Sequence, residues 1–222
     1  MIPIDTIVVP QGAEYQAVCR GLKKAPTKDI QVVAIPIGIN NIQQTLANYS
    51  TELDRTQNLL IIGLGGSLSN NYAVGDAVLY KSCLNIDRQQ VNLESELTTT
   101  IQEKLSIDLV TGLTSDRVIN RATEKLKLSQ IYSAKVVDME GYDYVKELQQ
   151  RNKTVSMVRV VSDDLTGDIP DLSKAIDGNG QLKMGTMAIA FLKQPIPAIR
   201  LIKGSLTGLN TIEQIIYKLN IL

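Results

Sequence analysis

The 222-residue sequence contains no histidine, and only two of its residues are cysteines, Cys19 and Cys83. Without histidine there is neither a Ser-His triad nor the usual set of zinc ligands. The two cysteines are too far apart in sequence to form a CxxC pair. Acid–base chemistry must therefore fall to carboxylates.

The sequence also lacks basic runs and long apolar runs. Lys plus Arg and Asp plus Glu number 23 each, which argues against a nucleic-acid partner and favours a small molecule or a protein. No apolar run reaches about 18 residues, and the N-terminus has no cationic segment followed by a long apolar core. We therefore expect a protein of the reducing cytoplasm.

Strand-like and helix-like segments alternate along the chain, with no linker or internal repeat between them. The length and the 44% hydrophobic content suit one domain spanning residues 1–222, with a C-terminal helical extension from about residue 193. The alternation predicts a three-layer α/β/α sandwich with a mixed, largely parallel central sheet. Its expected strands include residues 6–9, 31–39, 58–62, 134–140 and 155–161.

The apolar segment 155–161 predicts a buried strand, and Asp163 and Asp164 stand where it ends. In open α/β sheets the ligand crevice lies outside the carboxyl ends of the strands, so these acids are candidates for chemistry. Alternatively, an aspartate in this position caps a helix or starts a turn.

Two further acids follow expected strands. Glu14 lies in the first turn of a helix expected after residue 12, where it either complements the helix dipole or faces a ligand. Glu140 ends the expected strand 134–140 and precedes a helix over 142–151, for which it is a capping candidate as well as a ligand-binding one.

The segment Gly63 to Leu68 contains three glycines and is expected to form a loop that a ligand can approach closely. A dinucleotide site would require glycine in place of Leu68 and a helix directly afterwards. Residues 70–79 instead predict a loop followed by a strand, which argues against that site.

Four segments together resemble, in the same order, motifs of the nucleoside phosphorylase/nucleosidase superfamily. Glu14 matches its N-terminal acid, and Gly63 to Asp76 is similar to its glycine-rich segment with Val-Gly-Asp. Val137 to Glu140 resembles its strand ending in Met-Glu, and Arg159 to Asp163 resembles its Arg-x-x-Ser-Asp. The resemblance covers residues 6–192, and residues 177–181 and 191–202 are similar to the branch associated with hopanoid biosynthesis.

This resemblance implies cleavage of the N-glycosidic bond of a purine nucleoside, with Asp163 donating a proton to N7 of the departing base. Burial, and repulsion from Asp164, would raise the pKa of Asp163 toward neutrality. Glu140 would accept hydrogen bonds from both ribose hydroxyls, because a carboxylate offers two acceptor oxygens, and Met139 would pack against the sugar.

The other matched positions are implied to complete the pocket. Glu14 would activate water, as in the hydrolytic branch, and Arg159 would hold Asp163 or an ordered water. Backbone groups of Gly65 and Gly66 would line the base and sugar.

The acceptor of the sugar remains open between water and phosphate, and neither a metal nor an organic cofactor is implied. Trimeric bacterial phosphorylases carry a phosphate-binding arginine on the strand before the glycine-rich segment, whereas residues 59–62 here are all apolar. Phosphate would have to rely on Arg20, Arg117 or backbone amides, which favours hydrolysis. The hopanoid-associated branch, in contrast, implies phosphorolysis of adenosylhopane.

Three positions depart from the superfamily pattern. Leu64 is bulky, Val118 stands where an aromatic residue often contacts the base, and Asp164 is an additional acid. Tyr72 or Tyr142 could supply the missing aromatic surface. A paralogue that binds a nucleoside without cleaving it is the alternative, and an oxidoreductase with a nucleotide cofactor is a more distant one.

The C-terminal segment 191–222 predicts a helix closing on the sheet and a second short helix from Thr211. Its cations are Lys193, Arg200, Lys203 and Lys218. They fit either a cationic amphipathic surface that touches a membrane or an ordinary solvated face. The family resemblance implies a homodimer.

Overall fold

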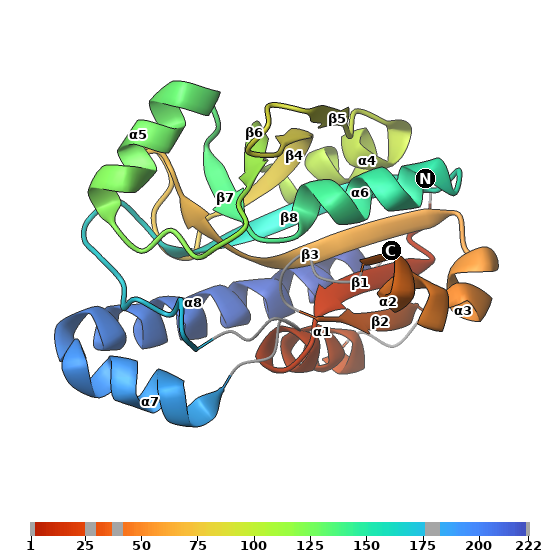
Figure 1. The fold of residues 1–222 in the computed structure, drawn as a ribbon. Coiled ribbons are helices and arrows are strands. Elements are labelled where there is room, and N and C mark those ends of the chain that lie inside the picture. Colours follow the sequence, from red (N-terminus) through yellow and green to blue (C-terminus); the bar gives the residue numbers. More distant parts are fainter. Residues whose placement is uncertain (1–2, 25–29, 37–41, 176–182, 221–222) are drawn as a thin grey trace.

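The computed structural model describes residues 3–24, 30–36, 42–175 and 183–220, and within these ranges the chain forms eight strands and eight helices (Figure 1). The elements in chain order are β1 (Thr6–Pro10), α1 (Ala13–Lys24), β2 (Gln31–Ile35), α2 (Ile42–Asn48), α3 (Ser50–Asp54), β3 (Asn58–Ser67), β4 (Ala77–Leu84), β5 (Gln90–Asn92), α4 (Glu96–Leu105), β6 (Asp108–Thr114), α5 (Ala122–Tyr132), β7 (Val136–Asp138), α6 (Gly141–Gln150), β8 (Thr154–Asp163), α7 (Met184–Lys193) and α8 (Pro195–Asn220).

The strands form one mixed sheet, which confirms the predicted fold class. Parallel pairs join β1 with β2 and β3, β3 with β8, and β6 with β4 and β7. Antiparallel pairs join β3 with β7, and β4 with β5 and β8. Since most pairs are parallel, the carboxyl ends of several strands meet at one edge of the sheet.

Helices cover both faces of the sheet because side chains alternate along each strand. Odd positions of β8 such as Met157 pack with the buried residues of α2, α3 and α6. Even positions such as Val158 and Val160 pack with α1, α4 and α8. Strands buried on both faces explain the continuous apolar runs in the sequence.

One side of the sheet closes on itself, which the sequence did not predict. β8 pairs with β3 and β4, β4 pairs with β6, and β6 reaches β3 again through β7. A register shift between Gly65 and Gly66 allows β3 to pair with both β8 and β7 near its end. These five strands form a closed ring, whereas β1 and β2 extend it as an open sheet.

Two predicted boundaries are wrong at the edge where the acids gather. The expected loop at Gly63 to Leu68 is instead mostly strand, because β3 continues through Ser67 by pairing with β8. The expected strand 134–140 is limited to Val136–Asp138, so Glu140 lies past the strand end, at the N-cap of α6.

The C-terminal region differs from the prediction of a separate helix from Thr211. α8 runs without a break from Pro195 to Asn220, and the Thr211 hydroxyl donates to the carbonyl oxygens of Thr207 and Gly75. Ile212 and Ile216 are buried in the core beside α1 and continue the packing of the same helix. No helix in the described parts of the chain has both the length and the apolar character needed to cross a bilayer.

The described ranges omit parts of two predictions. Residues 37–39 of the second expected strand and the segment 177–181 of the hopanoid-type resemblance lie outside the described residues.

Candidate active site

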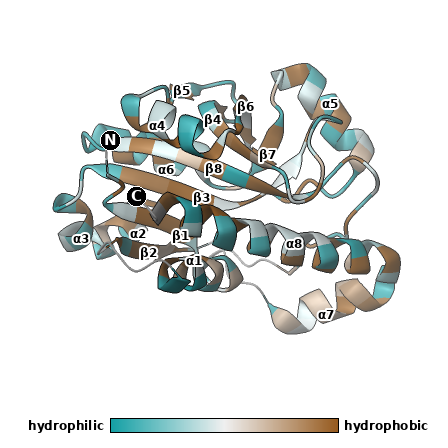
Figure 2. Ribbon diagram, turned by 180° about the vertical axis from the view of Figure 1, so that it is seen from behind, coloured by the Kyte–Doolittle hydropathy of each residue, from teal (hydrophilic) through white to brown (hydrophobic). Residues whose placement is uncertain are grey.

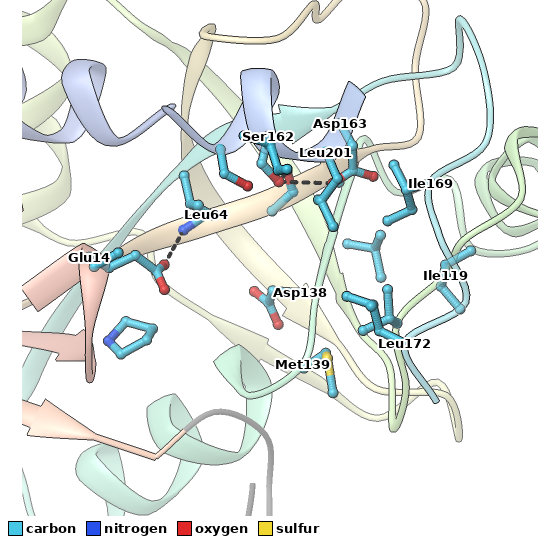
Figure 3. Close-up of a pocket in the computed structure, with 18 of the residues that line it drawn as sticks. Glu14, Leu64, Ile119, Asp138, Met139, Ser162, Asp163, Ile169, Leu172 and Leu201 are labelled. Atoms are coloured by element: carbon cyan, nitrogen blue, oxygen red, sulfur yellow. Dashed lines mark hydrogen bonds between the residues drawn. The ribbon is translucent and has the colours of Figure 1, made fainter. Parts of the chain in front are cut away.

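A cavity of about 490 Å³ lies beside the ends of β1, β3, β7 and β8 (Figure 3). Residues of α7 and α8 also contribute to its wall. The acids Glu14, Asp138, Glu140 and Asp163 line one part of it. The remaining wall is predominantly apolar and comes from β3, the segments after β6 and β8, and the two C-terminal helices. Its apolar residues include Leu64, Val118, Ile119, Ile169, Leu172, Met187, Phe191, Leu201, Ile202 and Leu206.

Glu14 faces the cavity from the first turn of α1. Its Oε1 accepts a hydrogen bond from the backbone N–H of Leu64 at 2.7 Å, so the carboxylate is directed toward β3 (Figure 3). Burial is the main cause that raises the pKa of Glu14 to about 7, and the nearby Glu140 adds to it, against the opposing effects of the Leu64 N–H and Arg159. Such a carboxyl group exchanges its proton near neutral pH.

Arg159 is fully buried and joins two acids of the cavity. Its Nε donates to Asp138 Oδ2 at 3.0 Å, and its Nη2 donates to Glu140 Oε1 at 3.1 Å. Burial opposes the charge, but the two carboxylates outweigh burial and raise the pKa of Arg159 above its usual value. Arg159 therefore orders Glu140. Among the described residues its side chain bonds to Asp138 and Glu140 and not to Asp163, so the expected contact with Asp163 is not formed.

The third nitrogen of Arg159, Nη1, is buried and has no hydrogen-bond partner among the described residues. It lies against the Cα of Gly63, where a Cβ atom would overlap it and would also stand 3.0 Å from Glu14 Oε1. Glycine at position 63 therefore leaves room for a guanidinium nitrogen beside the Glu14 carboxylate. Glycine is needed at position 63 because Arg159 approaches the backbone there, and not because the backbone has to be flexible.

Asp138 satisfies the N-terminus of α6, so Glu140 is not needed as a cap. Asp138 Oδ1 accepts from the N–H of Gly141 at 2.9 Å and from the Thr114 hydroxyl at 2.7 Å. The Thr114 hydroxyl oxygen in turn accepts from the N–H of Tyr142 at 2.8 Å. Glu140 is 4% exposed and makes no side-chain capping bond, which removes the structural alternative considered for it.

Asp163, the last residue of β8, neither caps a helix nor starts a turn. Its Oδ1 accepts from the Ser162 hydroxyl at 2.8 Å (Figure 3), and its Oδ2 pairs with the ammonium of Lys125 on α5. Lys125 was missed by the sequence reasoning because the segment 122–128 gave no reason to place a lysine inside.

Asp164 starts a turn, which was the alternative role considered for Asp163 and Asp164. Its Oδ1 accepts from the backbone N–H of Thr166 at 2.9 Å, and it does not line the cavity. Burial raises the pKa of Asp164, but hydrogen bonds from Thr166 and from the Val74 backbone outweigh burial and bring it below its usual value. Only Asp163 of the two is thus presented to a ligand.

The remaining predicted site residues divide into two groups. Met139, Gly65, Gly66 and Val118 all line the cavity. Arg117 is also at its wall, where it pairs with Glu124.

The other candidates lie elsewhere. Arg20 pairs with Glu213 of α8, and neither Tyr72 nor Tyr142 is part of the cavity wall. The Tyr72 hydroxyl donates to Asp108 and the Tyr142 hydroxyl to Gln89, so the expectation that either replaces an aromatic base contact is wrong. Phe191 of α7 is the one aromatic residue in the described wall.

No protein-family model and no curated protein matches the chain. Futalosine hydrolase of Helicobacter pylori has a similar structure, with a TM-score of 0.71, 12% identity, and coverage of 99% of this chain and 97% of that one. The chain has a nucleoside phosphorylase/nucleosidase fold.

Other solved structures share this nucleosidase fold. The 5′-methylthioadenosine/S-adenosylhomocysteine nucleosidase from Helicobacter pylori, with butyl-thio-DADMe-Immucillin-A, gives a TM-score of 0.63 at 16% identity and covers 97% of this chain and 98% of that one. The corresponding nucleosidase from Neisseria meningitidis, in complex with methylthio-immucillin-A, gives a TM-score of 0.65 at 13% identity. The match covers 96% of this chain and 99% of that one. The nucleosidase fold thus extends over nearly the whole chain, α7 and α8 included.

Proposed function

We propose that this protein cleaves the N-glycosidic bond of a purine nucleoside with its own side chains, without a metal or organic cofactor. The observation that carries the proposal is that Glu14, Glu140 and Asp163 reach one cavity from three separate parts of the chain; Figure 3 shows Glu14 and Asp163 in its wall. Solved nucleosidases with the same fold support it. Breaking the bond requires a proton on the base, a stabilised sugar cation and an acceptor for the sugar, and three acids can divide these tasks.

Asp163 and Glu140 suit the two halves of the substrate. Asp163, held by Ser162 and Lys125, would present its carboxyl group to N7 of the base. Glu140 would bind the ribose hydroxyls and stabilise positive charge on the sugar, while Arg159 fixes its orientation. Met139 lies beside Glu140 and offers an apolar contact to the sugar.

Water suits the acceptor position better than phosphate. Glu14, with a pKa of about 7, can take a proton from water, and the buried Arg159 Nη1 nearby can donate a hydrogen bond to the same molecule. A phosphate dianion at this position would be repelled by the carboxylates of Glu14 and Glu140. The adjacent guanidinium of Arg159 already donates two of its nitrogens to carboxylates, so it has little left to bind phosphate. Hydrolysis is therefore the proposed reaction, with phosphorolysis as its alternative.

The substrate is proposed to carry an apolar 5′ group. The cavity wall contributed by α7, α8 and the segment after β8 includes Leu172, Met187, Phe191 and Leu201, and offers few hydrogen-bonding groups. Burying an apolar substituent against it gains about 25 cal/mol per Å². Methylthioadenosine is the small member of this class, and adenosylhopane, implied by the softer family resemblance, is the large one.

Release of free adenine tests the proposal. Adenosine, methylthioadenosine and a 5′-alkyl adenosine are each incubated with the wild type and with Asp163→Asn, with and without phosphate. We expect adenine release from the wild type without phosphate, and a loss of about 10²–10⁴-fold in kcat for Asp163→Asn because the amide has no acidic proton. Asp164→Asn is the matched control and should retain turnover, since Asp164 lies outside the cavity wall.

Each other outcome changes the conclusion. Release that depends on phosphate would replace hydrolysis by phosphorolysis, and release of pyrimidines alone would contradict the assignment of Asp163 to N7. Adenosine binding without any release would favour the second candidate, a nucleoside-binding paralogue, for which the departures Leu64 and Val118 in the cavity wall are the supporting observations.

A weak contact with a membrane surface is proposed for the C-terminal helices. α7 has no buried residue and is largely apolar (Figure 2), and α8 continues the exposed apolar surface. Its exposed residues are Met184, Ile189, Leu192, Ile196, Ile199, Ile202 and Leu206. Of the cations, Arg200 is used in a hydrogen bond to Thr166, whereas Lys193 and Lys203 are exposed beside these apolar residues.

Co-sedimentation with liposomes tests this contact. We expect binding to anionic vesicles that weakens with salt and is reduced several-fold by Leu192→Ser combined with Ile196→Ser. Both residues are more than 70% exposed, so the double variant should keep its fold. No sedimentation with anionic vesicles at low salt would eliminate the membrane contact.

The resemblance to the superfamily also leads us to propose a homodimer in the cytoplasm. Cys19 and Cys83 are both free thiols, which suits a reducing compartment. Sedimentation velocity of the purified protein tests the oligomeric state.

A further inference from the structure

α5 has an unusual inner face. Its one buried residue is Lys125, whose side chain is 1% exposed, and its apolar residues Leu126 and Ile131 are exposed instead. A helix normally buries its apolar stripe and leaves lysine in solvent. α5 therefore places an ammonium group at the end of β8, whereas its apolar residues Leu128 and Tyr132 are only partly buried against the core.

The ammonium of Lys125 is directed at the proposed acid. It forms an ion pair and a hydrogen bond with Asp163 Oδ2, and its Nζ lies 3.4 Å from the Asp163 carbonyl oxygen and 3.5 Å from that of Asp164. The other carboxylate oxygen, Oδ1, accepts from Ser162. Both oxygens of Asp163 are thus held, one by a hydroxyl and one by a cation.

Gly66 leaves space for this pair. A Cβ atom at position 66 would stand 3.0 Å from Asp163 Oδ2 and 3.4 Å from Lys125 Nζ. Gly66, at the register shift in β3, therefore leaves room for the ammonium and the carboxylate beside the strand.

Stability alone does not account for the pair. Desolvation of a buried ammonium and carboxylate commonly exceeds their attraction, and well-packed apolar residues of similar volume often stabilise a fold as well or better. Asp163 of the pair lines the cavity, with Lys125 behind it, and a transferable proton has a use there. In this ion pair Lys125 Nζ is the donor and Asp163 Oδ2 the acceptor, so a lysine proton is the one placed to move onto the carboxylate.

We propose that Lys125 holds the proton that reaches the departing base, with Asp163 as the relay; this inference rests on the proposed glycosidic cleavage. The Lys125 N–H bond breaks and its proton moves to Asp163 Oδ2, while the carboxyl group gives a proton to N7. The C1′–N9 bond breaks, and its electron pair goes to the base.

The other half of the reaction balances this proton. Water adds its oxygen to C1′ and gives one proton to ionised Glu14. The products are the free base and the free sugar, with Lys125 neutral and Glu14 protonated. Exchange with solvent then moves one proton from Glu14 to Lys125 and restores the starting state.

The surrounding charges do not replace Lys125. The other charged groups of the cavity wall are Glu14 on α1, Arg117 after β6, Asp138 on β7 and Glu140 before α6. Arg117 pairs with Glu124 of α5, and Asp138 and Glu140 pair with Arg159 of β8. Asp164 after β8 bonds to Thr166. Lys125 is the one cation bonded to the Asp163 carboxylate among the described residues.

The pH profile of adenine release tests the inference in Lys125→Met, Lys125→Arg and the control Lys127→Met, an exposed position on the same helix. In Lys125→Met, the proton must be on Asp163 itself, so we expect the alkaline limb to move to lower pH and kcat at pH 8 to fall about 100-fold. In Lys125→Arg, the guanidinium keeps its proton, so we expect a similar loss at every pH with KM nearly unchanged. Lys127→Met should match the wild type.

The outcomes separate this inference from the proposed function. If the wild type releases no base from any nucleoside, the proposed function fails. If the wild type is active and Lys125→Arg retains its kcat, or folded Lys125→Met keeps the wild-type alkaline limb, Lys125 is structural and the inference is overturned. Circular dichroism and thermal unfolding check the fold of each variant. If Lys125→Met does not fold, the kcat of Lys125→Arg alone decides between a structural role and a proton-donating role for Lys125.

Discussion

Glu14→Gln is expected to lower kcat for water-dependent cleavage by about 10²–10³-fold, because an amide cannot take a proton from water. In the wild type, kcat should rise with pH through about 7, where Glu14 loses its proton. The variant should lose this acid limb and retain nucleoside binding. Steady-state kinetics from pH 5 to pH 9 measure both effects, and full activity of Glu14→Gln would remove Glu14 from the chemistry.

The same substitution should alter the pH dependence of stability. The pKa of Glu14 is about 7 in the folded state and 4.5 without the fold, so the folded protein binds more protons between these values. Its free energy of unfolding therefore falls as the pH rises from 4.5 to 7, by about 3 kcal/mol, and remains lower above pH 7.

Glu14→Gln removes that decline, so its stability relative to the wild type should increase between pH 4.5 and pH 8. Urea unfolding at several pH values measures the difference. Glu103→Gln, at an exposed position of α4, is the control and should follow the wild-type curve. Parallel curves for Glu14→Gln and the wild type would contradict the effect of burial on Glu14.

Arg159→Met is expected to destabilise the protein by about 3–5 kcal/mol and to abolish turnover. The substitution leaves two buried carboxylates, Asp138 and Glu140, without the cation they share, and an unpaired buried charge is costly. Arg151→Met is the matched control, since Arg151 forms a partly exposed pair with Glu147 four residues away on α6. It should cost no more than about 0.5 kcal/mol.

Chemical unfolding of the two variants provides the comparison. A change below about 1 kcal/mol for Arg159→Met would show that Asp138 and Glu140 do not depend on this guanidinium. Loss of activity with unchanged stability would instead indicate a role for Arg159 in the reaction alone.

The layers of the fold were predictable because strands buried on both faces leave long apolar runs in the sequence. β8 was predicted correctly for this reason, and its residues from Val155 to Asp163 are all buried. The closed ring of strands was not predictable, because it depends on β7 pairing with β3, a strand about seventy residues earlier. Nothing local in either segment specifies that pairing.

The acids of the site were predictable as strand-terminal carboxylates, whereas their partners were not. Lys125 lies 38 residues before Asp163 on a helix without a clear apolar stripe, so the sequence offered no reason to bury it. Gly63 was noticed as part of a loop, but its role became visible only with Arg159 packed against it. Side-chain partners across a fold depend on tertiary packing, which local patterns do not contain.

The position of β8 inside the ring separates a stiff part of the site from a movable one. β8 is hydrogen-bonded along both edges and carries Arg159 and Asp163 four residues apart, about 13 Å along one strand. Opening it would require breaking two ladders at once, so its amides should resist hydrogen exchange until global unfolding. α7 buries none of its side chains, so fewer contacts have to be broken to displace it. The amides of α7 are therefore expected to exchange much faster than those of β8, while Arg159 and Asp163 keep their places on the stiff strand.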